Sequence, residues 1–461
     1  MKRYKVVFLV VSLLLVSGLL FASGSKKGEK ADKGKAAPKV ELIKILSIDY
    51  PNTRAEQEIK GEFEEETGIM VEYSLFPYLG AHDKIKLALA TKDATFDIYQ
   101  YDSYYASGLN KMEGYAAMDP FIEDPDLPDI DPESFVPNSW KPWGFYNGKV
   151  ISIPTLQAIR LFAYRLDLFN DPKEQENFKK KYGYDLTPPD TWEQFADVAE
   201  FFTRDTDGDG KNDFWGFCGG FANNPAWDSI ADTYLTFKPI KGQDYWFDKD
   251  YNILFDNDKC VKAIQFWTDA WNAGWLDPGA VKRDYGAIRD LYDAGNTAMT
   301  IAWHDEFQYT ETNPNVMGKT GYKKIPKWED GVDHAQIAVQ QYAINKYVSE
   351  ERQKAAYMYL AWIKTPENDL RQALSENLKM PDREVNYYNE EVIAKQPYTD
   401  EVIENYKVGY PIPLIAEQNE FAFLFGQEIQ AAMLGKKTAQ EAVKSAAKQM
   451  REMFEQAGYY K

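Results

Sequence analysis

The feature that most constrains the fold is a regular alternation of strand-like and helix-like segments that begins at residue 40. Residues 40–48 alternate in polarity and are rich in β-branched side chains, a pattern that predicts a strand. The next segments repeat the alternation: a helix at 53–67 closed by Gly68, a strand at 69–75, a short helix at 81–90 and a strand at 96–101. Strands that alternate with helices in this way predict a mainly parallel α/β sheet.

The sequence predicts further strands and helices in the rest of the chain. Further strands are expected at 149–154, 159–164 and 298–303, and helices at 192–202, 259–272, 350–364 and 438–456, while the Pro- and Asp-rich residues 119–142 should be irregular. Thr191 and Gln194 have the spacing of a capping box at the start of the second-half helix 192–202. No Gly- or Ser-rich linker interrupts the pattern, so two lobes, if present, must be joined by ordered crossings.

Charge and aromatic content exclude several classes of protein. The chain of 461 residues has a net charge of −19, and residues 40–461 carry 44 basic and 70 acidic side chains. Such an acidic body repels phosphate backbones, which argues against nucleic acid as a partner. Aromatic residues make up 15% of the chain, a content that intrinsically disordered proteins lack. The length allows two or three domains with sizeable cores.

The N-terminus has the residue order of an export signal. Lys2, Arg3 and Lys5 precede an apolar run at 6–22, and small residues follow it. This order predicts a secretory signal peptide at 1–23, with an uncleaved membrane anchor as the competing interpretation. Residues 24–39 contain six Lys and no large apolar side chain, so we expect a flexible tether there. The protein is therefore expected in the periplasm or outside the cell, where it could remain tethered to the membrane.

The two cysteines leave two interpretations open. An oxidising compartment would permit a disulfide between Cys218 and Cys260. Two separate buried thiols are the favoured alternative, because one pair is not a disulfide framework.

Most catalytic motifs are absent from the sequence. His82, His304 and His334 are the only histidines, and none has a metal-ligand spacing. There is no nucleophile elbow, dinucleotide-binding fingerprint or complete phosphate loop. Hydrolysis by a pair of carboxylates remains an alternative, since the many acidic residues allow such pairs. No such pair stands out, however, and we expect a solvated acidic surface and no catalytic residues in a non-enzymatic protein.

One local motif predicts a cation site. The segment 205–213 places oxygen ligands at the positions that a calcium loop uses, with a turn Gly at its sixth position. The expected ligands are Asp205, Asp207, Asp209, the backbone carbonyl of Lys211, and Asp213. The usual Glu at position 12 is replaced by Gly216. Structural Ca²⁺ is the expected cofactor; a polar turn held by its own hydrogen bonds is the alternative.

Five stretches, in order, resemble extracellular solute-binding proteins of the maltose-binding type. They are Tyr146-Asn147-Gly148-Lys149 with the strands after it, Pro189-Asp190-Thr191-Trp192-Glu193-Gln194-Phe195, Ala294-Gly295-Asn296-Thr297-Ala298-Met299, residues 335–367, and residues 435–457. The resemblance extends over nearly the whole chain after residue 40. That family is the sugar-binding component of ATP-driven (ABC) importers.

The resemblance implies a two-lobed α/β periplasmic-binding-protein fold of type II, with ligand held in a cleft between the lobes. The implied lobes are 40–155 with 302–341, and 156–301 with 342–461. It also implies a monomer that closes on a carbohydrate, an oligosaccharide by expectation, by hinge motion and delivers it to the permease subunits of an importer. A secreted glycoside-active enzyme, or the same fold with a peptide or another polyol as ligand, are the alternatives.

Candidate ligand contacts follow from the expected strand ends and crossings, because ligands in open α/β sheets bind there. Aromatic faces suit the apolar faces of a sugar ring, and carboxylates, amides and Arg suit its hydroxyl groups. The candidates are Tyr50, Tyr78, Tyr101, Asp102, Gln157, Arg160, Asn223, Asn224, Trp227, Trp303, Asp305, Gln340, Gln341 and Tyr342. Gln340-Gln341 stand where the family often has Gly-Gly. Each aromatic candidate could instead belong to the core, and Asp102 could serve as a helix cap.

Overall fold

A computed structural model describes residues 40–239 and 244–460 of the chain. The predicted signal peptide at 1–23 and tether at 24–39 lie outside the described residues. In the part of the chain that is described, no helix combines the length and the apolar character that a membrane crossing requires.

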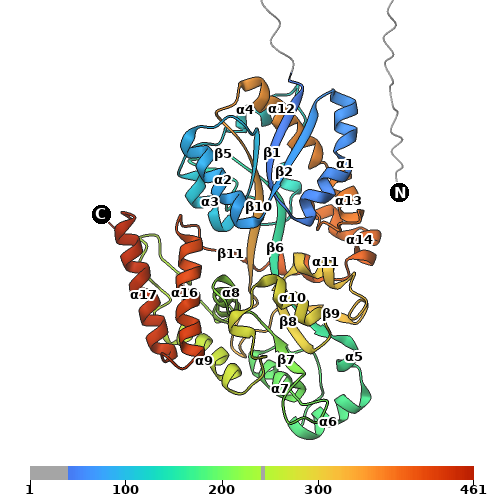
Figure 1. Cartoon of the computed structure of the whole chain (residues 1–461), viewed down its shortest axis with the longest axis vertical. Helices are drawn as coiled ribbons and strands as arrows, with labels where there is room; N and C mark the ends of the chain where they lie inside the picture. The colour runs from blue at the N-terminus through green and yellow to red at the C-terminus, as the bar shows by residue number, and fades with distance from the viewer. Residues whose placement is uncertain (1–39, 240–243, 461) are drawn as a thin grey trace, which may run out of the picture. The chain divides into compact units, whose positions relative to one another are not determined.

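A single mixed sheet runs through the described chain (Figure 1). Its main path has the order β2-β1-β3-β10-β6-β8-β7, with β11 paired to β10 and β9 paired to β6. The strands are β1 (Leu42–Ile48), β2 (Met70–Phe76), β3 (Ile98–Asp102), β6 (Ile153–Arg165), β7 (Trp215–Cys218), β8 (Thr297–Trp303), β9 (Thr320–Lys323), β10 (Ala335–Ile344) and β11 (Gly409–Pro411). β4 (Phe145–Tyr146) and β5 (Lys149–Val150) form a separate hairpin.

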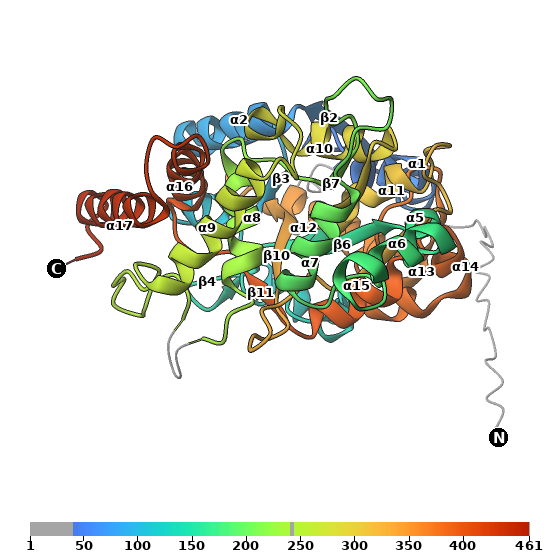
Figure 2. The same cartoon turned by 90° about the horizontal axis from the view of Figure 1, so that it is seen from below.

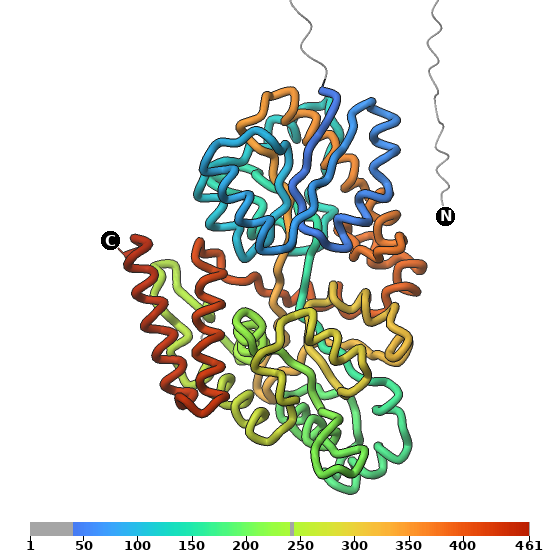
Figure 3. Tube along the Cα trace, viewed as in Figure 1, coloured from blue at the N-terminus to red at the C-terminus, as the bar shows by residue number. Residues whose placement is uncertain are grey.

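The prediction of a mainly parallel sheet holds only towards the two ends of this path. β1 pairs in parallel with β2 and β3, and β7 pairs in parallel with β8. The middle is antiparallel, because β10 and β6 cross between the two ends: β6 pairs with β10 through Ile153–Ile159 and with β8 through Arg160–Tyr164. The two crossing strands can be followed along the trace in Figure 3. The strands expected at 149–154 and 159–164 are thus β5 and one long strand, β6.

Helices cover the sheet on both sides of the crossing. Around β1–β3 lie α1 (Pro51–Thr67), α2 (Tyr78–Thr91), α3 (Ser103–Asn110), α12 (Glu350–Ile363) and α13 (Pro366–Leu374) (Figure 1). The remaining helices are α4 (Asp119–Ile122), α5 (Leu166–Phe169), α6 (Pro172–Tyr182), α7 (Trp192–Phe202), α8 (Asn224–Tyr234), α9 (Asp258–Asn272), α10 (Tyr285–Asp293), α11 (Phe307–Thr310), α14 (Glu390–Lys395), α15 (Thr399–Tyr406), α16 (Gln418–Met433) and α17 (Ala439–Gln456). Short 3₁₀ turns lie at Pro132–Ser134, Ala280–Lys282, His304–Glu306 (η3) and Glu384–Tyr388. α16 and α17 pack side by side on one flank (Figures 1 and 2).

The lobe boundaries expected from the resemblance stay a prediction, because Val40–Lys461 forms one compact unit by its contacts. One part of that expectation does not fit the packing. Helices α12 and α13 fall in 342–461, yet both pack against α1, and α12 shares a core with β1. Lys364, at the end of α12, also forms a fully buried ion pair of 2.9 Å with Glu56 of α1. Residues 350–374 therefore belong with the β1–β3 side of the molecule.

The helix ends show how local sequence sets the elements. Thr438 and Glu441 form a complete capping box at the start of α17. At α7 only half of the predicted box forms: Thr191 Oγ1 accepts from the Gln194 amide at 3.2 Å, but Gln194 Oε1 accepts from the Asp190 amide at 2.9 Å. The Gln side chain thus satisfies the amide one residue earlier than expected.

Both cysteines are buried free thiols, as the favoured interpretation expected. Cys218 lies on β7 and Cys260 on α9, and burial raises the pKa of each thiol well above its usual value. No disulfide joins them.

Candidate functional site

A cavity of about 330 Å³ lies where strand ends and helix starts from both sides of the sheet converge. Its walls combine aromatic rings with carboxylates and amides. The lining residues are Tyr50, Tyr78, Asp102, Tyr104, Leu156, Ala158, Asn224, Asp284, Tyr285, Gly286, Trp303, Asp305, Glu306, Ala338, Val339 and Gln340. Such a mixture of apolar faces and a few convergent polar groups is typical of small-molecule sites.

Half of the predicted ligand contacts line this cavity. They are Tyr50, Tyr78, Asp102, Asn224, Trp303, Asp305 and Gln340. They come together because β1, β3, β8 and α8 all end or begin at this edge, as the rule for open α/β sheets predicts.

Asp102 caps a helix, as one of its two predicted roles requires, and it lies where the other role, ligand contact, would place it. It is the N-cap of α3, where its Oδ1 accepts from the Tyr104 amide at 2.9 Å, and it also lines the cavity. Its own amide donates to Nε2 of His82 at 2.9 Å, which fixes the end of β3. Burial raises the pKa of Asp102 to about 6.

Asp305 and Glu306 compete for one hydroxyl proton. The Tyr50 hydroxyl lies 2.8 Å from Asp305 Oδ2 and 2.8 Å from Glu306 Oε1, and a tyrosine has a single O–H to donate. Glu306 has a second partner, since Arg289 pairs with it at 2.9 Å. Asp305 is only 6% exposed, and its Oδ1 has no hydrogen-bond partner in the described structure. Burial, and then the charge of Glu306, raise the pKa of Asp305 well above its usual range.

One buried carboxylate, that of Asp228, accepts hydrogen bonds from three aromatic side chains of the cavity lining. Asp228 of α8 is fully buried and accepts from the Tyr104 hydroxyl at 2.7 Å, the Tyr285 hydroxyl at 2.5 Å and Trp303 Nε1 at 3.3 Å. These rings come from α3, α10 and β8, so one side chain sets the position of walls from three elements. Burial raises the pKa of Asp228 to about 6.

Three predicted contacts on β3 and β10 are used for structure instead. Tyr101 is fully buried and stacks on Tyr115 at 5.2 Å, while the Tyr342 hydroxyl donates to Glu56. Gln341 accepts from Ser152 Oγ, whereas the adjacent Gln340 reaches the cavity. The pairing of β10 with β6 shifts register between these two glutamines, and this is where the sequence departs from the family's Gly-Gly.

Four more predicted contacts lie outside the cavity lining. Arg160 forms a two-pronged ion pair with Asp232 and lies 5.3 Å behind the Trp303 ring, so it supports that ring from the back. Gln157 is buried in β6 with neither of its polar atoms bonded among the described residues. Asn223 is exposed and lies at the N-cap position of α8 with a φ of 50°, but its side chain forms no capping hydrogen bond. Trp227 points into the core, because it shares a face of α8 with Ile230, Ala231 and Tyr234.

Sequence reasoning missed four polar or aromatic lining residues, namely Tyr104, Asp284, Tyr285 and Glu306. Tyr104 and Glu306 are one or two residues beyond chosen positions, so extending the search into the first helical turn would have found them. Asp284 and Tyr285 begin α10, which follows a 3₁₀ turn and no strand, so the strand-end rule could not indicate them. The signal available was the N-cap: Asp284 accepts from the Ala287 amide at 3.2 Å.

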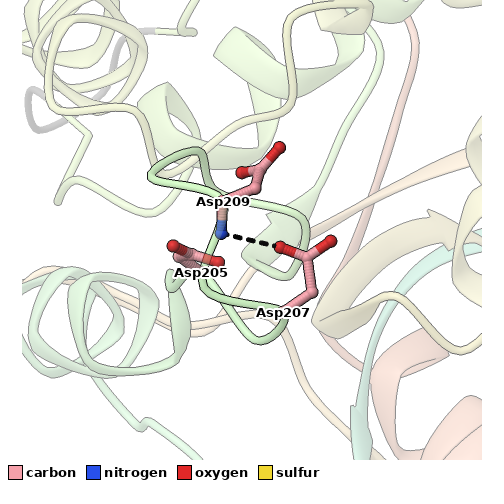
Figure 4. Close-up of side chains that lie close together, drawn as sticks. All are labelled: Asp205, Asp207 and Asp209. Atoms are coloured by element: carbon pink, nitrogen blue, oxygen red, sulfur yellow. Dashed lines mark hydrogen bonds between the residues drawn. The ribbon is translucent and has the colours of Figure 1, made fainter.

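The predicted cation loop lies between α7 and β7. Ligand atoms of Asp205, Asp207 and Asp209 all lie within 4.8 Å of one another, and Figure 4 shows the three side chains around the loop. Asp213 does not belong to this group; its carboxylate accepts from the amide and hydroxyl of Thr206. Asp205 Oδ2 accepts from the Gly210 amide at 2.8 Å, as in the alternative interpretation of a polar turn. The three carboxylates and the Lys211 carbonyl are of the oxygen type that a hard cation prefers.

Gly216 explains why this loop has no closing Glu. It lies on β7 where the strand passes α7, and a Cβ there would clash with the backbone of Ala199. No side chain fits at position 12 of the loop.

Comparison with known proteins supports the predicted resemblance. Residues 50–369 match the family model of bacterial extracellular solute-binding proteins. One relative is described as a probable amino-acid ABC transporter periplasmic-binding protein of Sinorhizobium fredii, with 22% identity over 434 residues that cover 91% of this chain and 90% of the relative. Another is the arabinooligosaccharide-binding protein of Bacillus subtilis, with 22% identity over 353 residues that cover 73% of this chain and 70% of the relative.

Solved structures confirm the fold. The maltose-bound MalE3 of T. maritima aligns with a TM-score of 0.74 at 19% identity, covering 89% of this chain and 99% of that one. A solute-binding protein of Agrobacterium radiobacter in complex with ribitol aligns with a TM-score of 0.71 at 17% identity, covering 90% and 99%. The chain therefore has the mixed α/β periplasmic-binding-protein fold that was predicted.

Proposed function

Because the chain belongs to the bacterial extracellular solute-binding protein family, a non-enzymatic component of transporters, we propose that its cavity binds a carbohydrate or polyol for an ABC importer. The observation that carries the proposal is the lining itself. Trp303, Tyr285 and Tyr104 offer faces for C–H groups, while Asp102, Asn224 and Gln340 offer acceptors and donors for hydroxyl groups.

The proposal also includes how the ligand is handed on. The Tyr104 hydroxyl of α3 already donates to Asp228 of α8 at 2.7 Å, so a hinge motion that admits and releases the ligand would break and remake this hydrogen bond. The closed protein, a monomer exported through its N-terminal signal, then presents the ligand to the permease subunits. An oligosaccharide is a narrower version of this proposal, and the arabinooligosaccharide-binding relative is in keeping with it.

An amino acid is the second candidate, favoured by the description of one relative. The cavity does not suit it. An amino acid carries a carboxylate, and none of the described lining residues is Lys, Arg or His. Four carboxylates line the cavity instead, so an anionic group would meet repulsion without a partner.

Calorimetry with sugars and polyols tests the function, with Trp303→Ala as the diagnostic variant. We expect binding by the native protein and a loss of affinity of about 30-fold in the variant, roughly the 2 kcal/mol typical of a central aromatic contact. Trp271→Ala is the matched control, because Trp271 lies on α9 outside the cavity lining. Equal loss in both variants, or no binding of any sugar or polyol by the native protein, would contradict the proposal.

We also propose that the loop at 205–213 binds Ca²⁺ as a structural ion. The convergence of three carboxylates supports it. Its ligands would be Asp205, Asp207, Asp209 and the Lys211 carbonyl, with Asp213 joining only if it releases Thr206.

A further inference from the structure

Asp305 is the one lining carboxylate whose charge nothing in the described structure offsets. Asp102 and Asp284 cap α3 and α10, where helix N-termini favour a negative charge, and Glu306 pairs with Arg289. Asp305 follows β8 in a three-residue 3₁₀ turn, which has no comparable dipole. It forms no ion pair among the described residues, and its only hydrogen-bond donor is the Tyr50 hydroxyl that Glu306 shares.

The unpartnered atom belongs to a side chain of the cavity lining, although the atom itself is buried. Asp305 lines the cavity while 94% of its surface is buried, and its Oδ1 has no partner. A buried carboxylate without a counter-charge is costly, and a hydroxyl group could satisfy the hydrogen bond but not the charge. A protonated amine does both. Five aromatic rings in the same lining, of Tyr50, Tyr78, Tyr104, Tyr285 and Trp303, also favour a cation over their faces.

We propose that the preferred ligand carries a positively charged nitrogen, an amino-substituted sugar or polyol, and that Asp305 selects it by pairing with that nitrogen. The inference rests on the proposed function, because it assumes that the sugar or polyol binds in this cavity. It also agrees with the lack of basic lining residues among those described, since a cation needs no such partner.

Matched ligand pairs provide the test, with calorimetry as the measurement. Glucose, mannose and galactose are each compared with their 2-amino-2-deoxy forms, and D-glucitol with 1-amino-1-deoxy-D-glucitol. Each pair differs only by an ammonium in place of a hydroxyl group. In at least one pair, we expect the native protein to bind the amine at least tenfold more tightly. The Asp305→Asn variant should bind both members of that pair with similar affinity.

Asp293→Asn is the matched control. Asp293 is also a buried aspartate with a raised pKa, but it bonds to Thr310 and is not in the cavity lining. This variant should keep the tenfold preference. Loss of the preference in both variants would mean that Asp305 acts only through general stability, and the proposal would be wrong.

The pH dependence gives a second readout. The titratable groups that face Asp305 come from several elements and are Tyr50, Asp102, Glu306, Tyr309, Tyr398 and Tyr406. Because burial keeps Asp305 partly protonated, ammonium binding should release a proton, and affinity for 1-amino-1-deoxy-D-glucitol should rise with pH between 5.5 and 8. A primary amine remains protonated there, with a pKa near 10. Asp305→Asn should lose most of this rise.

The outcomes separate this inference from the proposed function. Tighter binding of the neutral member in every pair that binds overturns the amine preference and leaves a sugar or polyol carrier. Binding of choline, a cation without a polyol chain, together with silence from every sugar and polyol would keep the charge preference and overturn the carbohydrate function. Silence from all probes overturns both.

Discussion

At the scale of single residues, Asp228 organises the cavity although it does not line it. It accepts from two tyrosine hydroxyls and one indole N–H, and each donor belongs to a ring in the cavity wall. An ionised carboxylate has enough lone pairs for all three donors, whereas an amide has fewer acceptor sites and adds two donors of its own. The position of the aromatic walls therefore depends on the charge state of one buried group.

We expect Asp228→Asn to weaken ligand binding about tenfold, since at least one buried donor is left unsatisfied at a cost of about 1–3 kcal/mol. A structural role alone would shift stability, so the informative measurement is affinity against pH. Native affinity should fall as pH drops through about 6, where Asp228 takes up a proton, while the variant should show less of this fall. Asp250→Asn, an exposed carboxylate, is the control. Parallel pH profiles for native and Asp228→Asn proteins would contradict this role.

The sequence predicted residues at strand ends. It could not distinguish those that line the cavity from neighbouring residues that face the core. Asp102 and Trp303 follow the strand-end rule and line the cavity. Trp227 lies three residues after Asn224, and its sequence neighbours are as polar as those of the cavity residues. It nevertheless faces the core because of its position around helix α8. The start of α8 was not recognised as a helix, so its phase could not be used.

At the scale of elements, hydrophobic periodicity located the helices and strands that it predicted within a few residues of their observed bounds. It missed helices such as α6, α8 and α16, and it could not give the direction of the central strands. β6 is buried along nearly all of its length, so it has no alternation to distinguish one strand from two. Its antiparallel partners are far away in sequence, because β10 begins at Ala335. Pairing between strands so far apart in sequence leaves no local signal. The rule that alternating strands and helices form a parallel sheet therefore does not hold for the central strands.

The loop between α7 and β7 carries the element-scale prediction. If it binds Ca²⁺, millimolar Ca²⁺ should raise Tm relative to protein in excess EDTA, because ligand that binds only the folded state stabilises it. Replacing Asp207 and Asp209 together by Asn should abolish the difference, since it removes two of the three converging carboxylates. Both Asp side chains bond mainly to amides within the loop, so the fold should survive the change.

The matched control for the loop is an Asx turn elsewhere. Asp248 holds a turn through the amides of Asp250 and Asn252, and Asp248→Asn should leave the calcium response unchanged. A calcium response that persists in the Asp207/Asp209 double variant would place the ion elsewhere. A native protein with equal Tm in Ca²⁺ and EDTA would favour the polar-turn interpretation.

At the scale of the whole molecule, the cavity concentrates buried negative charge at a cost to folding. Asp102 and Asp228 both have a pKa of about 6 in the folded protein, compared with about 3.9 in an unfolded chain. Between those values the folded state binds more protons than the unfolded state, so the contribution of these groups to stability falls as pH rises from about 4 to 6. The ligand-free protein therefore loses stability through these two groups, of which Asp102 lies in the cavity lining as an acceptor for a ligand.

Asp102→Asn tests the stability cost of this buried charge without removing a structural contact, because Asn caps a helix about as well as Asp does. The native protein bears the cost of an ionised Asp102 fully above pH 6 and not at all below pH 4, so the variant should be more stable at pH 8 by up to about 3 kcal/mol. That advantage should disappear towards pH 4. Thermal unfolding of the ligand-free proteins across this range measures it. Saturating ligand should reverse the order at pH 8, because only the native carboxylate bonds the ligand with full charge. A variant that is less stable than the native protein at pH 8 without ligand would show that the charge on Asp102 stabilises the fold.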